Sequence, residues 1–163
     1  MSFTLHIIPL AQLRELAHSE VPSTLTHDYD ADALPPPFVA ARGVQQIDAG
    51  ESAAWCSTFY VIRNRDNRIV GACGFKHPPQ DGIVEIGYAI SSKSRNEGAA
   101  TAAVAQLLST AFAGGATAVL AEVNPENIAS TSVVRKLHFQ NMGVRIDEDN
   151  NEQLVRWLAK SAA

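Results

Sequence analysis

The stretch from Val84 to Ala113 most constrains what this chain folds into. It begins as an apolar run, passes through a short polar loop, and continues into an alanine-rich segment that a Gly-Gly pair ends. The apolar run predicts a strand, and the segment that starts at Gly98 predicts a helix. The first amides of such a helix have no partner within it, and the helix dipole favours negative charge there. A strand that turns through small residues into a helix therefore predicts an anion-binding site.

The loop itself, from Arg95 to Ala100, separates kinds of anion site. A P-loop needs a Lys-Ser/Thr pair after its second glycine, and a dinucleotide fingerprint needs three glycines. The loop has neither, because Gly98 is its single glycine. Small residues at 98–100 let a phosphate approach the backbone amides, and Arg95 and Lys93 supply positive charge. The loop alone leaves two alternatives, a phosphate site and an ordinary helix start.

Apolar periodicity and turn residues predict one α/β domain with a mixed central sheet of about seven strands and helices on both faces. Three consecutive strands in the middle of the chain form hairpins. The alanine-rich helix joins two strands that we expect to run parallel. The expected strands are 3–8, 57–63, 69–76, 83–90, 116–123, 139–146 and 153–159, and the expected helices are 9–17, 38–47, 98–113 and 124–137.

Two helices carry more specific expectations. In helix 38–47, Phe38, Val39 and Ile47 are expected to point inward. The last helix is expected to begin at Asn124-Pro125-Glu126, because Asn caps a helix, Pro suits the first turn, and an acid complements the dipole.

Composition excludes several classes of protein. The chain has 163 residues and a formal net charge of −4, which argues against a general nucleic-acid binder. No stretch approaches the ~20 apolar residues of a membrane span, so no membrane partner is expected. The N-terminus lacks the pattern of a secretory signal. Cys56 and Cys73 have neither paired nor metal-type spacing, so we interpret them as reduced thiols and expect a cytoplasmic protein.

Three motifs in order carry a family resemblance. Residues 85–90 (EIGYAI) form a Glu-Ile-Gly-Tyr strand, and residues 95–100 (RNEGAA) fit Gln/Arg-x-x-Gly-x-Gly/Ala. Residues 127–130 (NIAS) and 136–139 (KLHF) are similar to an Asn-x-x-Ser helix with a Lys-Leu-Gly-Phe ending. Over roughly Ser57 to Ala159, the chain thus resembles the GCN5-related N-acetyltransferase (GNAT) superfamily, in particular its RimJ/RimL-like branch. The resemblance implies an enzyme that moves the acetyl group of acetyl-CoA directly to a primary amine of a small molecule or a protein N-terminus.

The resemblance also implies where acetyl-CoA binds. In the family, the strand before the loop separates from the next parallel strand, and the pantetheine arm lies in the gap. A Gly87 and Ala89 face would leave room for that arm. Residues 95–100 would hold the pyrophosphate and residues 88–90 the reacting end, and no metal is implied. The residues implied to bind the cofactor are Tyr88, Ala89, Ile90, Arg95, Asn96, Glu97, Gly98, Ala99, Ala100 and Asn127.

Helical periodicity places Asn127, Ser130 and Val134 on one stripe, which the resemblance turns toward the cofactor. Alternatively, Asn127 helps to cap the helix and Ser130 packs a close helix contact. Val134 stands where many family members have a Tyr general acid, so Ser130 is the hydroxyl expected to protonate the leaving thiolate. Two further departures from the family pattern are Ala100, in place of the second loop glycine, and His138, in place of the glycine before the final Phe.

Glu85 is the expected general base, because it lies in an otherwise apolar strand in phase with Gly87 and Ala89. The alternative is a structural ion pair or a strand-edge residue. His77 and His27 are rivals, because a neutral imidazole suits the task. Backbone N–H groups near Ala89 and Ile90 are expected to polarise the acetyl carbonyl.

The acceptor side is expected within residues 1–56, and the cofactor-binding core within residues 57–159. Asp28, Asp30 and Asp32 hint at a cationic amine, although a solvated loop is the alternative. Two other functions compete with the transferase: a non-catalytic acyl-CoA-binding or sensor module, and a nucleotide-binding αβ domain. The final hairpin, with Trp157 and Leu158, is where a homodimer would pair.

Overall fold

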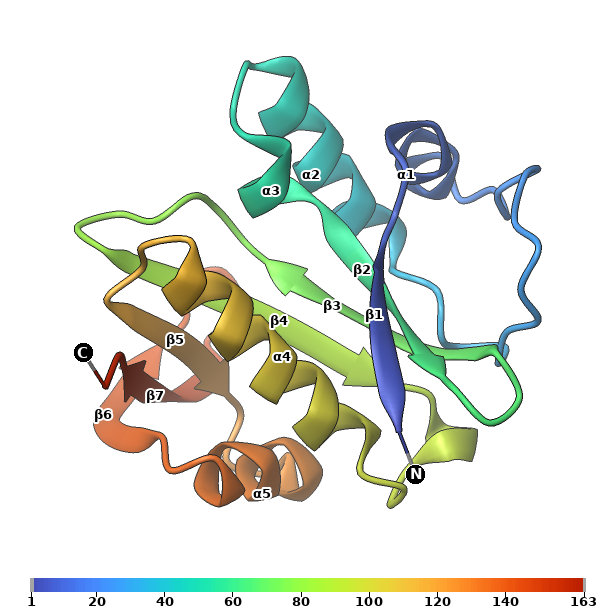
Figure 1. The fold of residues 1–163 in the computed structure, drawn as a ribbon. Coiled ribbons are helices and arrows are strands. Elements are labelled where there is room, and N and C mark those ends of the chain that lie inside the picture. The colour runs from blue at the N-terminus through green and yellow to red at the C-terminus, as the bar shows by residue number, and fades with distance from the viewer. Residues whose placement is uncertain (1, 163) are drawn as a thin grey trace.

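The computed structural model describes residues 2–162 as a seven-stranded mixed sheet with the strand order β1-β2-β3-β4-β5-β7-β6. Figure 1 shows the helices packed around this sheet, and the predicted fold class is confirmed. The strands are β1 (Phe3–Ile7), β2 (Thr58–Arg63), β3 (Arg68–Phe75), β4 (Ile83–Ile90), β5 (Ala118–Val123), β6 (Gln140–Ile146) and β7 (Gln153–Lys160). The helices are α1 (Leu10–Ala17), α2 (Pro37–Asp48), α3 (Ala53–Cys56), α4 (Ala99–Ala113) and α5 (Ile128–Lys136), with a 3₁₀ turn at Ser92–Ser94.

The sheet changes direction at the strand–loop–helix stretch. Strands β1 to β4 pair antiparallel in order, and the predicted hairpins β2–β3 and β3–β4 are confirmed. Strand β4 then pairs parallel with β5, because α4 carries the chain back along the sheet between them. This connection sets the first turn of α4 beside the carboxyl end of β4, where the sequence predicted an anion site.

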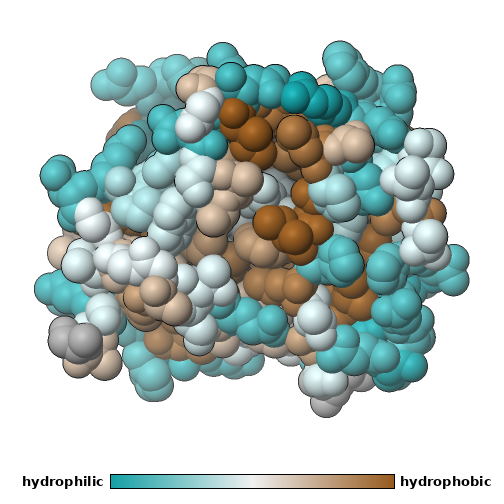
Figure 2. Space-filling view, turned by 45° about the horizontal axis from the view of Figure 1, so that its top comes forward, coloured by the Kyte–Doolittle hydropathy of each residue, from teal (hydrophilic) through white to brown (hydrophobic). Residues whose placement is uncertain are grey.

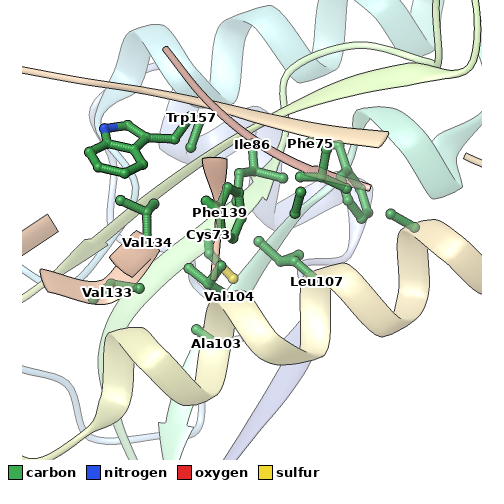
Figure 3. Packing of buried hydrophobic residues seen from close by; sticks show 14 of the residues in the cluster. Cys73, Phe75, Ile86, Ala103, Val104, Leu107, Val133, Val134, Phe139 and Trp157 are labelled. Carbon is green, nitrogen blue, oxygen red and sulfur yellow. The ribbon is translucent and has the colours of Figure 1, made fainter. Parts of the chain in front are cut away.

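Two clusters of buried residues show that helices cover both faces. Val61 packs with α4 and α5 residues, whereas its strand neighbours Tyr60 and Ile62 pack with α1 and α2 residues. Successive side chains of a strand point to opposite faces, so α4 and α5 lie on one face and α1 and α2 on the other. Figure 3 shows Val104 and Leu107 of α4 among strand residues of the first cluster.

The inward face of α2 differs from the prediction. Phe38 is 70% exposed, while Ala40 and Gly43 are buried. The inward stripe therefore follows Ala40, Gly43 and the partly buried Ile47, whose inward direction agrees with the prediction. Phe38 lies about 200° around the helix from Ala40. Gly43 lets the helix approach α3 closely, because a Cβ there would lie 2.6 Å from the carbonyl oxygen of Cys56.

The start of α5 also differs from the prediction. The helix begins at Ile128 and its N-cap is Asn127, whose Oδ1 accepts a hydrogen bond from the Ser130 N–H at 3.1 Å. Asn124 instead closes the preceding turn, since its Oδ1 accepts from the Glu126 N–H at 2.8 Å. Two Asn residues three positions apart both suit a cap, and the second one takes it.

The surface combines hydrophilic margins with apolar areas. Figure 2 shows the face that comes forward when the top of Figure 1 is turned toward the viewer; hydrophobic residues gather around a hollow in its middle. Exposed large apolar side chains include Ile7, Leu10 and Phe38. Within residues 2–162, no helix is long and apolar enough to cross a membrane.

Candidate functional site

Strands β4 and β5 separate part-way along their length. Their parallel pairing joins Ile83, Val84 and Glu85 to Ala118, Val119 and Leu120, and it stops there although both strands continue. The edge of β4 beyond Glu85 therefore faces a gap on the β5 side, while its other edge stays paired with β3 as far as Ile90. An extended chain with amide groups could pair with such an edge as a substitute strand.

A cleft with a volume of ≈ 670 Å³ opens at this gap, between the end of β4, the start of α4, and α5. Ten of the residues selected from the sequence come together here. The cleft is lined by Tyr88, Ala89, Ile90, Arg95, Asn96, Gly98, Ala99, Ala100, Asn127 and Ser130, together with Ser94, Thr101, Ile128, Ala129, Ser132, Val133 and Lys136.

The loop turns its backbone at two left-handed positions, Asn96 with φ 63° and Gly98 with φ 86°. Gly98 is the N-cap of α4 and offers no side chain, so the first amides of the helix are open to a ligand. A Cβ at Gly98 would meet no heavy atom within 4 Å, which means that its φ rather than crowding within the chain favours glycine there. Backbone amides arranged in this way bind anions, and Arg95 and Lys136 add positive charge to the lining.

A family model described as acetyltransferase (GNAT) domain matches residues 12–140. The chain belongs to the GNAT acetyltransferase family.

Individual relatives agree with this assignment. An uncharacterized N-acetyltransferase p20 from Bacillus licheniformis is 29% identical over 106 residues, which is 64% of this chain and 60% of that protein. The chain thus matches less than two thirds of the length of this curated relative.

Solved structures share the fold at low sequence identity. A ribosomal-protein-S5-alanine acetyltransferase from Vibrio fischeri is 13% identical with a TM-score of 0.69, covering 99% of this chain and 94% of its own. The microcin C7 self-immunity acetyltransferase MccE, in complex with acetyl-CoA and AMP, is 13% identical with a TM-score of 0.62, covering 77% of this chain and 69% of its own.

A second cavity, with a volume of ≈ 300 Å³, adjoins the ≈ 670 Å³ cleft at the gap between β4 and β5. Tyr88, Asn127 and Ser130 line both spaces. The second cavity is otherwise lined by Lys76, Ile86, Gly87, Ala121, Glu122, Val123, Asn124, Glu152 and Leu154. The gap between β4 and β5 therefore gives access from two sides to one group of side chains.

Charged pairs surround the second cavity. Lys76 Nζ donates to Glu85 Oε2 at 2.6 Å, so the expected general base has a cationic partner. Arg145 donates to both oxygens of Glu122, at 2.7 and 2.9 Å, and this hydrogen-bonded charge lowers the pKa of Glu122. The structural ion pair considered for Glu85 is thus present, and a catalytic role must operate from within it.

Tyr88 crosses from β4 to α5. Its hydroxyl donates to the carbonyl oxygen of Ser130 at 3.2 Å, and burial raises the pKa of its phenol. Because the phenol stays protonated, Tyr88 and Ser130 are two hydroxyl groups at the junction of the two cavities. The sequence identified both residues but did not indicate that one contacts the backbone of the other.

Val134 does not face the cleft, contrary to the predicted stripe. It is fully buried and packs in the core near Trp157, as Figure 3 shows. Val133 lines the cleft in its place. The stripe that faces the cleft therefore runs Asn127, Ser130, Val133, with Val133 in the place predicted for Val134.

Glu97 has a different role from its loop neighbours. Its carboxylate accepts from Arg63 Nη1 at 2.8 Å, and the residue does not line the cleft. Asp30, one of the three acidic residues expected on the acceptor side, is 2% exposed and bonded to Arg68, Ser91 and Ser94, so its carboxylate is not part of an open surface. Asp28 and Asp32 are exposed.

Sequence reasoning missed Lys136, Ser94 and Val133 in the cleft lining. Lys136 belonged to the Lys-Leu-x-Phe ending that carried the resemblance, so a basic residue in the last turn of that helix was the available signal. Neither rival histidine lines either cavity: His27 contacts the ring of His6, and His77 Nδ1 lies 2.6 Å from the carbonyl oxygen of Pro78. Among residues 2–162, no group of three or more His, Cys, Asp or Glu could hold a metal ion.

Proposed function

We propose that the protein transfers the acetyl group of acetyl-CoA directly to a primary amine, of a small molecule or of a protein N-terminus. The observation that carries the proposal is the separation of β4 from β5 beyond Glu85, with the loop-lined cleft at the gap. The free edge of β4 suits the amide-containing pantetheine arm. The amides at the start of α4, with Arg95 and Lys136, suit the phosphates. Membership of the GNAT family supports the same donor.

The chemistry falls to groups at the gap. The backbone N–H of Ile90 would polarise the acetyl carbonyl and stabilise the negative charge that develops on its oxygen. The N–H of Ala89 points instead to β3, because the Ser91 N–H bonds to Val70 of β3 and successive strand amides alternate in direction. Glu85 would accept the proton of the amine. Ser130 would protonate the departing thiolate, since it lies at the junction of the cleft and the second cavity. Positioning of the two reactants would supply much of the rate.

We further propose that the amine enters through the second cavity. Lys76, which holds Glu85, lines that cavity, so an amine there would approach the thioester from the side of the proposed base. Arg145 already balances Glu122, so Glu152 would be the carboxylate in the lining that favours a cationic acceptor. On this proposal the acceptor would bind partly within residues 57–159, while residues 1–56 would shape the entrance. A cytoplasmic location is part of the proposal, supported by the free cysteines Cys56 and Cys73.

An amine panel tests the function. The purified chain is given acetyl-CoA with polyamines, amino-acid amides, aminoglycosides, or peptides of varied N-terminal residue, and free thiol is measured with each. We expect thiol release that depends on the added amine, with the acetylated amine identified by mass spectrometry.

The buried Val134, at the place of the family's Tyr, favours a non-catalytic acyl-CoA sensor as the second candidate. Binding of acetyl-CoA with no amine-dependent release across the panel would support the sensor and contradict the transferase.

A further inference from the structure

The segment that leads into the anion-binding loop rests on a buried carboxylate. Ser91 and Ser94 each donate a hydrogen bond of 2.5 Å to Oδ2 of Asp30, and all three residues are at most 2% exposed. Oδ1 of Asp30 accepts from Arg68 Nε at 2.6 Å. Asp32, in the same irregular segment, accepts from the backbone N–H and the hydroxyl of Ser92, both at 3.1 Å. The acidic segment therefore holds the 3₁₀ turn between β4 and the loop.

A buried guanidinium holds the same loop from β2. Arg63 is 7% exposed, and its Nη1 donates to Glu97 Oε2 at 2.8 Å and to Ser94 Oγ at 3.3 Å. The hydroxyl of Ser94 thus donates to Asp30 and accepts from Arg63, so the two charged groups share it. Asp66 balances the rest of the guanidinium, with two hydrogen bonds of 3.0 and 2.7 Å.

These contacts fall on either side of Arg95 and Asn96 and leave these two loop residues open to the cleft. Ser94 is bonded to Asp30, and Glu97 is bonded to Arg63. Between them, Arg95 and Asn96 line the cleft together with Gly98. Asn96, with its left-handed φ, lies inside this clamped stretch, and the left-handed Gly98 follows directly after it. Fixing both ends sets the direction of the loop amides before a ligand arrives, which lowers the entropic cost of binding.

We infer that Asp30 and Arg63 are positioning residues for the pyrophosphate of coenzyme A, acting through Ser94 and Glu97 on the loop amides. This inference rests on the proposed function. It reassigns Asp30, on the acceptor side of the predicted division, to the cofactor. Asp30 and Arg63 touch no reacting atom, so their removal weakens cofactor binding while the chemical step at the other end of the cleft remains.

A purely structural role makes a different prediction, because it would weaken every function of the fold together. The backbone around Asp30 has its own contacts: the Asp30 N–H donates to the carbonyl oxygen of Ile69 at 3.0 Å, and the Ile69 N–H donates to that of Asp28 at 2.9 Å. Replacing only the carboxylate therefore leaves this segment bound to β3. The loop loses its clamp while the fold keeps its backbone bonds.

The test compares acetyl-CoA with S-acetylpantetheine, which carries the same thioester and arm but no pyrophosphate. Asp30→Asn, Ser94→Ala and Arg63→Gln are assayed with both donors at saturating amine, and the affinity for CoA is measured separately by calorimetry. Asp48→Asn is the control, because Asp48 pairs with Arg14 at 2.6 Å on the surface and does not contact the loop. Because the clamp fixes the loop amides before the ligand binds, we expect its loss to lower CoA affinity roughly 10-fold, which is about 1.4 kcal/mol.

In Asp30→Asn and Ser94→Ala, the ratio of kcat/KM for acetyl-CoA to that for S-acetylpantetheine should fall by a similar factor, and Asp48→Asn should keep the wild-type ratio. Equal losses with the two donors, or wild-type CoA affinity in both variants, would overturn the inference. If Asp30→Asn does not fold, Ser94→Ala decides by the same ratio, because it removes only one hydroxyl. A wild-type protein that neither binds CoA nor releases thiol would instead contradict the proposed function itself, so the two failures are distinguishable.

Discussion

Lys76 Nζ and Glu85 Oε2 lie 2.6 Å apart. This ion pair joins the residue that follows β3 to β4, one of the two strands that separate at the gap. The side chain of Glu85 is 17% exposed and that of Lys76 34% exposed, so solvent reaches both. The carboxylate of Glu85 thus lies near the second cavity, which Lys76 lines, but it is already paired with the Lys76 ammonium group. Kinetics of variants at the two positions therefore separates a role of Glu85 on the amine from a role in holding Lys76.

We expect Glu85→Gln to lower kcat by about 100-fold, a usual loss when a general base is removed. The KM for acetyl-CoA should change little, because Glu85 does not line the larger cleft. Lys76→Met should lower kcat much less, since Lys76 only holds the base. Steady-state kinetics with the best amine of the panel measures both effects, with Asp48→Asn as control. Similar small losses in the two variants, accompanied by similar drops in Tm, would show that the pair is only structural.

The hydroxyl at the thiolate is a second point for mutagenesis. Ser130→Ala should lower kcat by roughly 10- to 100-fold, because the leaving thiolate loses its proton donor. Tyr88→Phe should leave kcat within a few-fold and cost about 1 kcal/mol of unfolding free energy, since its hydroxyl is bonded to the Ser130 carbonyl. Ser109→Ala, on an exposed part of α4, is the control. A larger kcat loss in Tyr88→Phe than in Ser130→Ala would transfer the role to Tyr88.

Local pattern was sufficient to predict most of the fold. The run from Ile83 to Ile90 and the alanine-rich helix after it appear within one residue of the expected bounds, because periodicity and the glycines that end the helix act locally. The start of α5 was not fixed in this way, since Asn124 and Asn127 have equal capping ability. Which of them caps is decided by the turn that Asn124 closes and by packing of Val133 and Val134.

The site residues, like the helix and strand bounds, were predictable where they depend on neighbours in sequence and not where they depend on distant residues. Residues within the loop, such as Arg95 and Gly98, were found because neighbours in sequence stay neighbours in space. Partners distant in sequence were not found: Asp30 and Arg63 approach Ser94 only because the sheet and the irregular segment bring them together. Charge pattern alone made Asp30 look like an open acidic surface, whereas burial and three hydrogen-bonding partners show an anchor.

Gly98 offers a test of the loop with a control of matching geometry. Gly98 has φ 86° and Gly50 has φ 94°, and a Cβ at either would meet no heavy atom within 4 Å. Alanine at each position should therefore cost a similar ~1 kcal/mol of stability from the left-handed backbone. Only Gly98→Ala should also raise the KM for acetyl-CoA, by about 10-fold, because its new methyl group lies where a phosphate would approach the amides. Equal KM values in the two variants would place the phosphates elsewhere.

Asp30 gives the fold a dependence on acid. Burial alone raises the pKa of Asp30, but hydrogen bonds from Arg68, Ser91 and Ser94 outweigh it and lower the pKa from 3.8 to about 2. A carboxyl with a lower pKa in the folded state stabilises the fold above its unfolded pKa, and that contribution is lost as pH falls toward the folded pKa. The shift corresponds to about 2 kcal/mol of unfolding free energy, present above about pH 5 and lost toward pH 2.

Urea unfolding at a series of pH values should therefore show a steeper loss of unfolding free energy with falling pH for the wild type than for Asp30→Asn. Asp48→Asn tests whether an exposed ion pair does the same, and we expect its curve to follow the wild type closely because solvent screens that pair. Parallel curves for the wild type and Asp30→Asn would contradict the lowered pKa of the Asp30 carboxyl in the folded protein.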